Sequence, residues 1–189
     1  MARPKSFEPA VALEKAMIEF WHNGYERTST DTLATAMGVG KRSLYDTFGS
    51  KHHLYLRTLT TYIERAEASH DLAVDEAAHG GLRRIRALLR SRVQAPGCPA
   101  GCYAVNAVTE RPDDPEVLAT VSGYFSRSRD LIAWLLRQEP GWTDAEAEQR
   151  AKAAETIHHA WLGLRVQARM GCPDPDLDAG TDELLARFR

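Results

Sequence analysis

The stretch "GVGKRSLYDTFGSKHHLYL", from Gly38 to Leu56, combines two kinds of residue on one short predicted helix. Leu44 and Phe48 are four residues apart, a spacing that places two apolar side chains on the same face of a helix. Cations and hydroxyl groups occupy other positions: Lys41, Arg42, Ser43 and Tyr45. A helix of this length is marginal in water unless it packs against other elements. We therefore expect the apolar pair to hold the helix on a core and the polar group to face a partner outside the protein.

A second short helix precedes this one, and the two form a predicted helical hairpin. Thr28 or Ser29 can cap its start, and its inner face is apolar: Leu33, Ala34 and Met37. Gly38, in the turn "MGVG", supplies a left-handed residue. Two short amphipathic helices joined by a glycine turn are typical of the helix-turn-helix, whose second helix lies in the DNA major groove. Such hairpins also occur in proteins that do not bind DNA, so the pattern by itself leaves a plain structural role open.

Cations gather around this hairpin although the whole chain is slightly acidic. The 189 residues include 24 Lys and Arg against 26 Asp and Glu, a formal net charge of −2. Residues 39–57 hold four cations and one carboxylate: Lys41, Arg42, Lys51 and Arg57 against Asp46. A non-specific DNA-binding protein would be far more basic, and a plain helical interaction module would not need these cations. The motifs yield neither the nucleophile–base set nor the metal cluster of an enzyme, so we expect no enzymatic activity.

The bulk composition is that of a water-soluble globular protein. Hydrophobic residues make up 43% and charged residues 26% of the chain. No run of about 18 apolar residues is present, so we expect no membrane span. The N-terminus "MARPKSFEPAVALEKAM" lacks the uncharged apolar block of a signal peptide, and we expect a cytoplasmic protein.

Helical periodicity continues to the end of the chain, and no segment shows sustained strand alternation. The pattern predicts a helix from Lys51, capped by Ser50, to about Ser69. Further helices are expected at residues 9–24, 82–89, 102–110, 115–137, 143–170 and 182–188. Asp114 is expected to cap the helix that begins at residue 115, and Thr143 and Glu146 to form a T-x-x-E capping box. The sequence "APGCPAG", residues 95–101, is expected to be a loop. The predicted fold class is all-α.

The arrangement resembles the TetR family of bacterial transcription regulators. The resemblance runs through "GYERTSTDTLATAMGVGKRSLYDTFGSKHHLYLRTL", Gly24 to Leu59, and its most specific element is "LYDTFGSK", which matches the family pattern LYxxFxSK. The sequence "GCYAVNAVTE" at residues 101–110, followed by "DDPEV", resembles the ligand domain of one large subgroup. The resemblance implies an N-terminal three-helix DNA-binding domain, residues 1–50. It also implies a C-terminal helical domain that binds a ligand and dimerises, residues 51–189.

The resemblance also assigns roles to residues around the hairpin. Tyr45 and Lys51 match positions that hold DNA phosphates, and Thr28 or Ser29 matches another. The positions that read the groove are Lys41, Arg42 and Ser43. Gly40 stands where the family usually has a Ser or Thr cap, and Arg42 stands where a small residue is commoner. An Arg there can contact guanine through two hydrogen bonds or bind a phosphate.

The later helices contain candidates for an effector pocket and for a dimer interface. Six bulky or polar residues interrupt apolar stripes: Tyr62, Tyr103, Asn106, Trp134, His158 and Trp161. Pockets combine apolar walls with a few polar groups, although each of these residues singly is as readily explained as core. Small residues on one side of the helix expected at 143–170, Ala147, Ala151 and Ala154, suit close helix packing, either between subunits or within the core.

The three cysteines are too few for a disulfide framework, and their spacing does not suit zinc. Cys98 and Cys102 flank "PAG" in the predicted loop, where a thiol switch is an alternative to an inert role. We expect no metal ion and no cofactor. The sequence as a whole predicts a homodimeric repressor that binds a palindromic double-stranded DNA operator. A small, largely apolar effector would release it. The alternatives are a thiol-based redox or electrophile sensor that uses Cys98 and Cys102, and an activator of the same fold.

Overall fold

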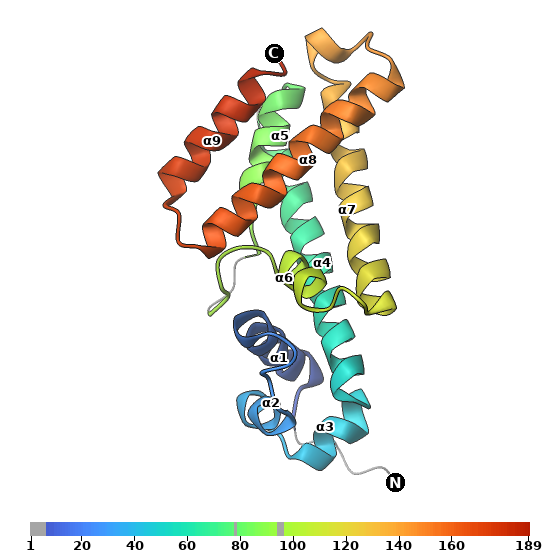
Figure 1. The fold of residues 1–189 in the computed structure, drawn as a ribbon, viewed down its shortest axis with the longest axis vertical. Helices are drawn as coiled ribbons and strands as arrows, with labels where there is room; N and C mark the ends of the chain where they lie inside the picture. Colours follow the sequence, from blue (N-terminus) through green and yellow to red (C-terminus); the bar gives the residue numbers. More distant parts are fainter. Residues whose placement is uncertain (1–6, 78, 94–96) are drawn as a thin grey trace. The chain divides into compact units, whose positions relative to one another are not determined.

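The computed structural model describes residues 7–77, 79–93 and 97–189, and these residues fold into helices without a strand (Figure 1). The elements are α1 (Pro9–Asn23), α2 (Thr30–Met37), α3 (Lys41–Phe48), α4 (Lys51–Glu76), α5 (Gly81–Arg90), α6 (Tyr103–Glu110), α7 (Pro115–Leu136), the 3₁₀ turn η1 (Pro140–Trp142), α8 (Ala147–Arg169) and α9 (Asp174–Ala186). The all-α prediction is confirmed. Residues 1–6, the start of the N-terminal stretch in which no signal peptide is expected, and the first two residues of the predicted loop, 95 and 96, lie outside the described residues.

The chain forms two compact units. Unit 1 comprises Met1–Ile63, Ala95–Pro99 and Tyr103–Thr120, and unit 2 comprises Glu64–Gln94, Ala100–Cys102 and Val121–Arg189. Two long helices, α4 and α7, each contribute one part to unit 1 and the other to unit 2. Compact units are not functional domains, and the division into residues 1–50 and 51–189 stays a prediction.

The first three helices follow from local signals in the sequence. Pro9 begins α1, where its missing N–H costs nothing, and Gly24 ends it at φ +80. Gly38 ends α2 in the left-handed conformation, with φ +71. The apolar faces of these helices form the local core: Met17, Phe20, Trp21, Leu33, Met37, Leu44 and Phe48 are all buried. The predicted positions of the first three helices are thereby confirmed.

Two predicted boundaries in the later helices are wrong, the end of α4 and the start of α8. Helix α4 continues past Ser69 to Glu76, since no proline interrupts it there. Helix α8 begins at Ala147, because the capping box is made by Glu146 and Gln149. Thr143 instead donates a hydrogen bond from its hydroxyl to the Glu139 carbonyl, 3.2 Å away, and closes the η1 turn.

The last helix is also longer than predicted, because it begins at Asp174 and not at residue 182. Its first turn contains a proline, which is tolerated there, and the carboxylates of Asp174 and Asp176, which suit the positive end of the helix dipole. Helix α9 packs on α5 and α8 in unit 2. Within the described ranges, none of the helices is long and apolar enough to span a bilayer.

Candidate functional site

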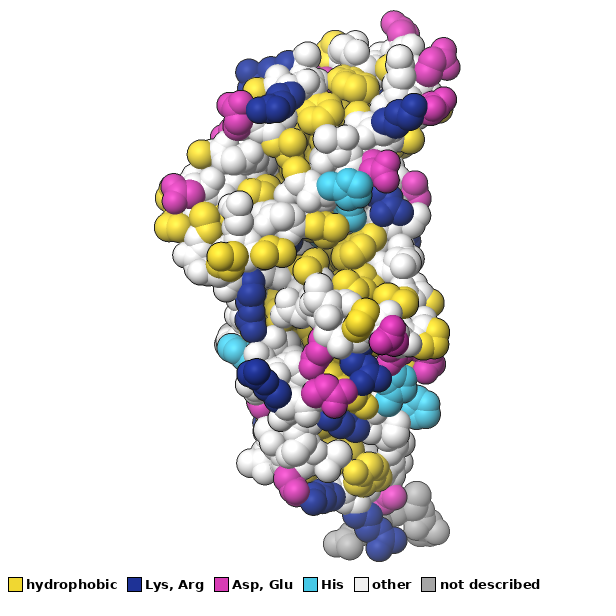
Figure 2. Space-filling model, in the orientation of Figure 1, with side chains coloured by type: hydrophobic (Ala, Val, Ile, Leu, Met, Phe, Trp, Pro, Cys, Tyr) yellow, Lys and Arg dark blue, Asp and Glu magenta, His cyan; other side chains and the backbone are white. Residues whose placement is uncertain are grey.

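Helix α3 presents one buried and one exposed face. Leu44 and Phe48 are buried, as the spacing predicted. Arg42 points into solvent, with 96% of its side chain exposed, and Tyr45 is exposed on the next turn. Figure 2 shows Lys and Arg side chains, in dark blue, over α2 and α3. The helix is therefore anchored by its apolar pair and leaves its cations and hydroxyl groups accessible.

The N-terminus of α3 has no side-chain cap, because Gly40 occupies the N-cap position. Its first backbone N–H groups lack intrahelical partners and carry the positive end of the helix dipole, which suits a phosphate. Lys41 forms an ion pair with Asp31 on α2, with 2.6 Å between the charged atoms. Arg42 lies 3.8 Å from Asp46 one turn later, so this carboxylate accompanies the arginine. Both pairs are solvent-exposed and therefore weak enough to exchange for DNA.

The start of α2 distinguishes between the two alternatives for its cap. Ser29 is the N-cap, and its hydroxyl oxygen accepts a hydrogen bond of 3.0 Å from the Thr32 N–H. The hydroxyl of Thr28 donates to the Gly24 carbonyl, and the whole residue is buried. Ser29 thus has the accessible side chain of the two.

Tyr25, in the turn between α1 and α2, lies between two cations. The Lys51 ammonium is 4.2 Å from the centre of the tyrosine ring, and the Arg111 guanidinium carbon is 4.5 Å from it. The ring also meets Tyr55 edge-on, with 4.9 Å between the ring centres. Burial raises the pKa of Tyr25, although Arg111 acts in the opposite direction. Lys51, half-buried at the start of α4, is therefore held on the surface of this turn.

The side chain of Glu110, the last residue of α6, binds the backbone of the turn between α1 and α2. Its carboxylate accepts hydrogen bonds from the N–H groups of Tyr25, at 2.7 Å, and Glu26, at 3.0 Å. Gly24 leaves room for this carboxylate, because a Cβ atom there would lie 2.7 Å from a Glu110 oxygen. Charge-assisted bonds of this kind are stronger than bonds between neutral groups. The contact joins α6 to the turn that leads into the helix-turn-helix.

Arg111 and Asp114, which follow Glu110 in the sequence, form a second group of polar contacts that reaches α4. Asp114 caps α7, as predicted, by accepting from the N–H groups of Glu116 and Val117 at 3.2 Å each. Burial opposes its ionisation, but these N–H groups and the guanidinium of Arg111 outweigh burial and lower the pKa of Asp114. His52 on α4 lies 3.5 Å from Asp114 and 3.0 Å from Glu116. No sequence pattern predicted these contacts, although Glu110 ends the motif "GCYAVNAVTE".

The residues proposed for an effector pocket are divided between the two units. Tyr62, Tyr103 and Asn106 lie in unit 1, where Tyr103 is buried and its hydroxyl is 3.1 Å from that of Thr58. Tyr62 and Tyr103 pack edge-on with their ring centres 5.7 Å apart, as parts of an aromatic core.

Unit 2 contains the other three proposed pocket residues. His158 and Trp161 are buried on α8, with 5.4 Å between their ring centres. Trp134 is 51% exposed on α7. The structure thus brings two of these three residues together and places the third at the surface.

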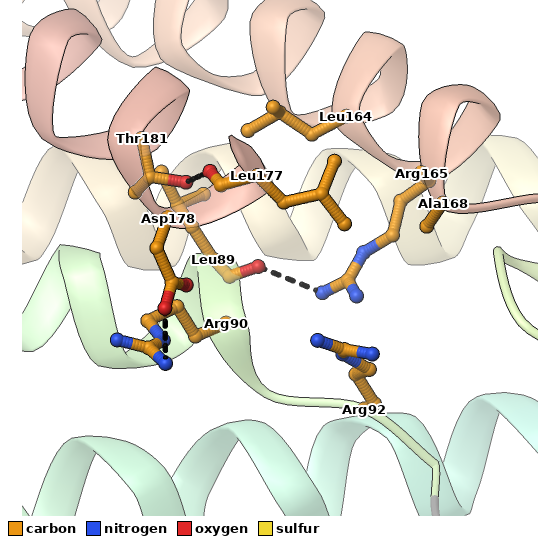
Figure 3. A pocket seen from close by; sticks show the side chains of 9 residues that line it. All are labelled: Leu89, Arg90, Arg92, Leu164, Arg165, Ala168, Leu177, Asp178 and Thr181. Atoms are coloured by element: carbon orange, nitrogen blue, oxygen red, sulfur yellow. Dashed lines mark hydrogen bonds and ion pairs between the residues drawn. The ribbon is translucent and has the colours of Figure 1, made fainter. Parts of the chain in front are cut away.

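A cavity between α5, α8 and α9 is lined by charged side chains and is too small for a ligand (Figure 3). The buried guanidinium of Arg165 donates to the carbonyls of Leu89, at 3.0 Å, and Ser91, at 2.5 Å. At the side of the cavity Arg90 pairs with Asp178 at 2.6 Å. The cavity measures about 20 Å³, room for little more than a water molecule. Arg165 therefore fixes the C-terminal end of α5.

The cysteines form no disulfide with one another. Cys98 is half-buried in the segment after residue 96, and the neighbouring Gly97 carbonyl lies 3.0 Å from a ring nitrogen of His22 on α1. Cys102 is buried in unit 2, and Cys172 is half-buried after α8. Among the described residues, no three His, Cys, Asp or Glu side chains are grouped to hold a metal ion.

The fold and the exposed polar face of α3 define a helix-turn-helix transcription regulator, and comparisons with known proteins agree. Residues 12–58 match the model of bacterial regulatory proteins of the tetR family. The chain is 34% identical to the HTH-type transcriptional regulator YezE of Bacillus subtilis (strain 168), covering 100% of this chain and 83% of that protein. It is 29% identical to the HTH-type transcriptional repressor ComR of Escherichia coli (strain K12), over 89% and 83% of the two chains.

A solved structure extends the similarity to the whole fold. A cysteine mutant of the TetR family transcriptional regulator CifR, in complex with 26-base-pair operator DNA, superposes with a TM-score of 0.86, 28% identity and full coverage of both chains. The chain belongs to the TetR family of bacterial transcription regulators. It is a DNA-binding regulator and not an enzyme, as the sequence predicted.

Proposed function

We propose that the protein is a homodimeric repressor that binds a palindromic operator and is released by a small, largely apolar effector. The observation that carries the proposal is the division of α3 into a buried pair, Leu44 and Phe48, and an exposed cationic face. Two similar proteins support the proposal. ComR is named as a transcriptional repressor, and the structure of CifR contains operator DNA. The protein would act in the cytoplasm, where such DNA is present.

The groove-reading side chains are proposed to be those at the N-terminal end of α3: Lys41, Arg42 and Ser43. Arg42 is the best placed to read a base, because it is almost fully exposed. Ser29, Tyr45 and Lys51 would bind phosphates on either side. Base contacts change sequence preference, whereas phosphate contacts change affinity for all sequences alike. Thr28 is buried, so of the two candidates at this position only Ser29 is proposed as a phosphate contact.

The dimer is proposed to form through α8 and α9, in the functional domain that begins near residue 51. Val166 and Met170 are large apolar side chains exposed near the end of α8. Ala147 and Ala151 are exposed at its beginning, whereas Ala154 is buried. Figure 2 shows hydrophobic side chains, in yellow, over α8 and α9. A two-fold dimer would place two recognition helices about one DNA turn, roughly 34 Å, or slightly more apart.

Release by an effector requires that the ligand changes the arrangement of the recognition helices. Helix α4 begins at Lys51 and continues into unit 2, and Glu110 binds the turn before α2. Both elements offer a path by which a ligand could act on DNA affinity. A population change from 1:99 to 99:1 requires about 5.5 kcal/mol of differential binding.

A thiol-based sensor is the second candidate function. Cys98 is partly accessible, and the next residue towards the N-terminus contacts His22 on α1. Oxidation or alkylation of this thiol would therefore occur beside the DNA-binding helices. Band-shift assays with peroxide or a quinone distinguish the two functions, because only the wild-type protein and not Cys98→Ser should then lose the operator. An activator of the same fold is the third alternative, and a reporter gene under the selected operator separates it from a repressor.

The DNA contacts predict different effects for two substitutions. After selection of bound sequences from a random DNA pool, Lys51→Ala should weaken binding to every sequence and make the salt dependence shallower by about one unit. Arg42→Ala should relax the preference at one base position, by about 1–3 kcal/mol if it reads guanine. Lys15→Ala, an exposed lysine on α1, is the control. A pool without a palindrome, or an unchanged salt slope for Lys51→Ala, would contradict the proposal.

A further inference from the structure

Unit 2 contains two buried histidines in a cluster of aromatic rings. His70 on α4 stacks on Tyr124, with 6.0 Å between ring centres and 19° between ring planes. Trp161 lies between the histidines, 5.7 Å from His70 and 5.4 Å from His158. His70 is 4% exposed and His158 1% exposed. Phe125 closes the cluster at 5.2 Å from His158.

These polar groups have no hydrogen-bond partners within the described residues. Both ring nitrogens of His158 and the indole nitrogen of Trp161 are fully buried and unpaired. His70 stacks on Tyr124 and meets Trp161 edge-on, and no described residue hydrogen-bonds to its ring nitrogens. Leaving a buried polar group unpaired is costly, and each native case calls for an explanation such as an absent ligand. Several cases in one aromatic cluster point to a site that a ligand completes.

A cavity between α4 and α7 reaches one member of this cluster, His70. It measures about 260 Å³, close to the lower end of the range for ligand pockets, about 300 Å³. The lining side chains of this α4–α7 cavity are Glu67, His70, Asp71, Arg127, Ser128 and Leu131. His70 belongs to both the cavity and the cluster. A molecule in the cavity would therefore meet an imidazole that is almost entirely buried and has no other partner.

The charges around the cavity disfavour a charged ligand of either sign. At its rim Arg127 is already paired with Glu67, at 2.7 Å, and Asp71 adds a second carboxylate. Because Arg127 neutralises Glu67, Asp71 leaves the rim with a net negative charge, which disfavours an anion. On the inner side Arg165 is close enough to His70 to help lower the pKa of the imidazole, to about 4, after burial as the main cause. A cation at the imidazole would face this arginine.

We propose that the α4–α7 cavity is the effector site, and that it takes a small uncharged molecule whose hydroxyl group hydrogen-bonds to His70. The inference rests on the proposed function of an effector-released regulator and names the chemical class of its effector. A neutral imidazole offers one donor and one acceptor, and a hydroxyl group can complement either. The Ser128 hydroxyl, which donates to the Tyr124 carbonyl at 3.0 Å, keeps lone pairs for the ligand. Leu131 supplies an apolar wall.

A larger hollow lies between α5, η1 and α9. It measures about 630 Å³ and contains Arg86 and Glu139. Arg86 is bound to Asp182, and Glu139 accepts from the Leu82 N–H at 3.0 Å. Arg86 and Glu139 thus already have partners, whereas no described residue hydrogen-bonds to the imidazole of His70.

Calorimetry with four probes tests the ligand class. Each probe contains one benzene ring, and they differ in the polar group: benzyl alcohol, toluene, benzoate and benzylamine. Benzyl alcohol should bind about tenfold more tightly than toluene, the difference expected for one hydrogen bond. Benzoate and benzylamine should bind more weakly still. Equal binding of benzyl alcohol and toluene, tighter binding of either ion, or no binding of benzyl alcohol would overturn the proposal.

Variants locate the binding site. His70→Phe keeps an aromatic ring but removes both nitrogens, so it should fold as the wild type and lose the preference for benzyl alcohol over toluene. Ser128→Ala should weaken benzyl alcohol binding severalfold, and Ser126→Ala, an exposed serine on the same helix, should not. If His70→Phe retained the full preference, His70 would not be the ligand contact.

Measuring operator binding in the absence of any probe tests the proposed repressor function separately from the proposed effector site. If the wild type binds its selected operator but no probe of this class, the effector class is wrong and the regulator stands. If the protein binds benzyl alcohol through His70 but binds no palindromic operator, the ligand site stands and the proposed homodimeric repressor is wrong. Release of the operator by benzyl alcohol in the wild type, and its loss in His70→Phe, is the expected result.

Discussion

His70 and His158 also make the stability of the protein depend on pH. Burial lowers the pKa of each to about 4, from 6.5, assisted by Arg165 near His70 and by Arg129 and His159 near His158. The unfolded chain therefore binds more protons than the folded chain between about pH 6.5 and 4. The free energy of unfolding should fall as the pH drops through this window, by roughly 3 kcal/mol for each histidine.

Urea unfolding at pH 7.0, 5.5 and 4.5 measures this effect. His70→Phe and His158→Phe should each flatten the pH profile, because the phenylalanine takes up no proton. His79→Phe, at an exposed position after α4, is the matched control and should follow the wild type. The double variant His70→Phe/His158→Phe with a wild-type profile would show that other groups cause the loss.

Some site residues were accessible to sequence reasoning and others were not. Arg42 and Tyr45 could be placed on the exposed face of α3 because Leu44 and Phe48 fix which side is buried. His70 was missed because the fourth helix was expected to end at about Ser69, which left this histidine outside any apolar stripe. Helix length beyond the last strong periodic residue is set by packing, and the local sequence does not carry that information.

At the scale of elements, the junction of α6 with the turn between α1 and α2 depends on Glu110. The Glu110 carboxylate accepts hydrogen bonds from the backbone N–H groups of Tyr25 and Glu26. Replacing Glu110 by alanine would leave the partly buried N–H group of Tyr25 without a partner. Glu110→Ala should therefore lower stability by about 1–3 kcal/mol and weaken operator binding. Glu110→Gln retains one acceptor oxygen and should have a smaller effect.

Urea unfolding and a band-shift titration measure the two consequences. Glu19→Ala is the matched control, since its carboxylate accepts an exposed hydrogen bond from Asn23 at 2.7 Å and should contribute little. Glu110→Ala that unfolds and binds DNA as the wild type does would show that the turn keeps its conformation without this contact.

Helix boundaries were predictable where a local signal has no competitor. Ser50 and Asp114 both accept hydrogen bonds from the first turn of their helices, as expected. The capping box predicted for Thr143 and Glu146 does not form, because Glu146 and Gln149 form one three residues later. The sequence pattern alone does not show which of the two boxes begins the helix. The early start of α9 was missed because "CPDPDLDAG" reads as a loop until its packing on α5 and α8 is known.

At the scale of the whole molecule, operator binding is expected to require two copies of the chain. One recognition helix contacts only a few base pairs, and specific affinity arises when two half-sites are bound together with a fixed spacing. The exposed apolar residues of α8 are the surface proposed to join the copies. Met170 is 81% exposed, and Val166 lies one turn before it.

Val166→Glu should therefore separate the dimer without unfolding the chain, because the side chain is exposed in the single chain and the charge resists burial between two copies. Sedimentation at micromolar concentration should show a dimer for the wild type and a monomer for the variant. The monomer should bind a half-site and the full palindrome with similar, weak affinity, whereas the wild type should prefer the palindrome strongly. Leu72→Glu, which adds the same charge at an exposed leucine of α4, should remain dimeric. A dimeric Val166→Glu would place the interface elsewhere, and a monomeric wild type that binds the palindrome tightly would contradict the requirement for two copies.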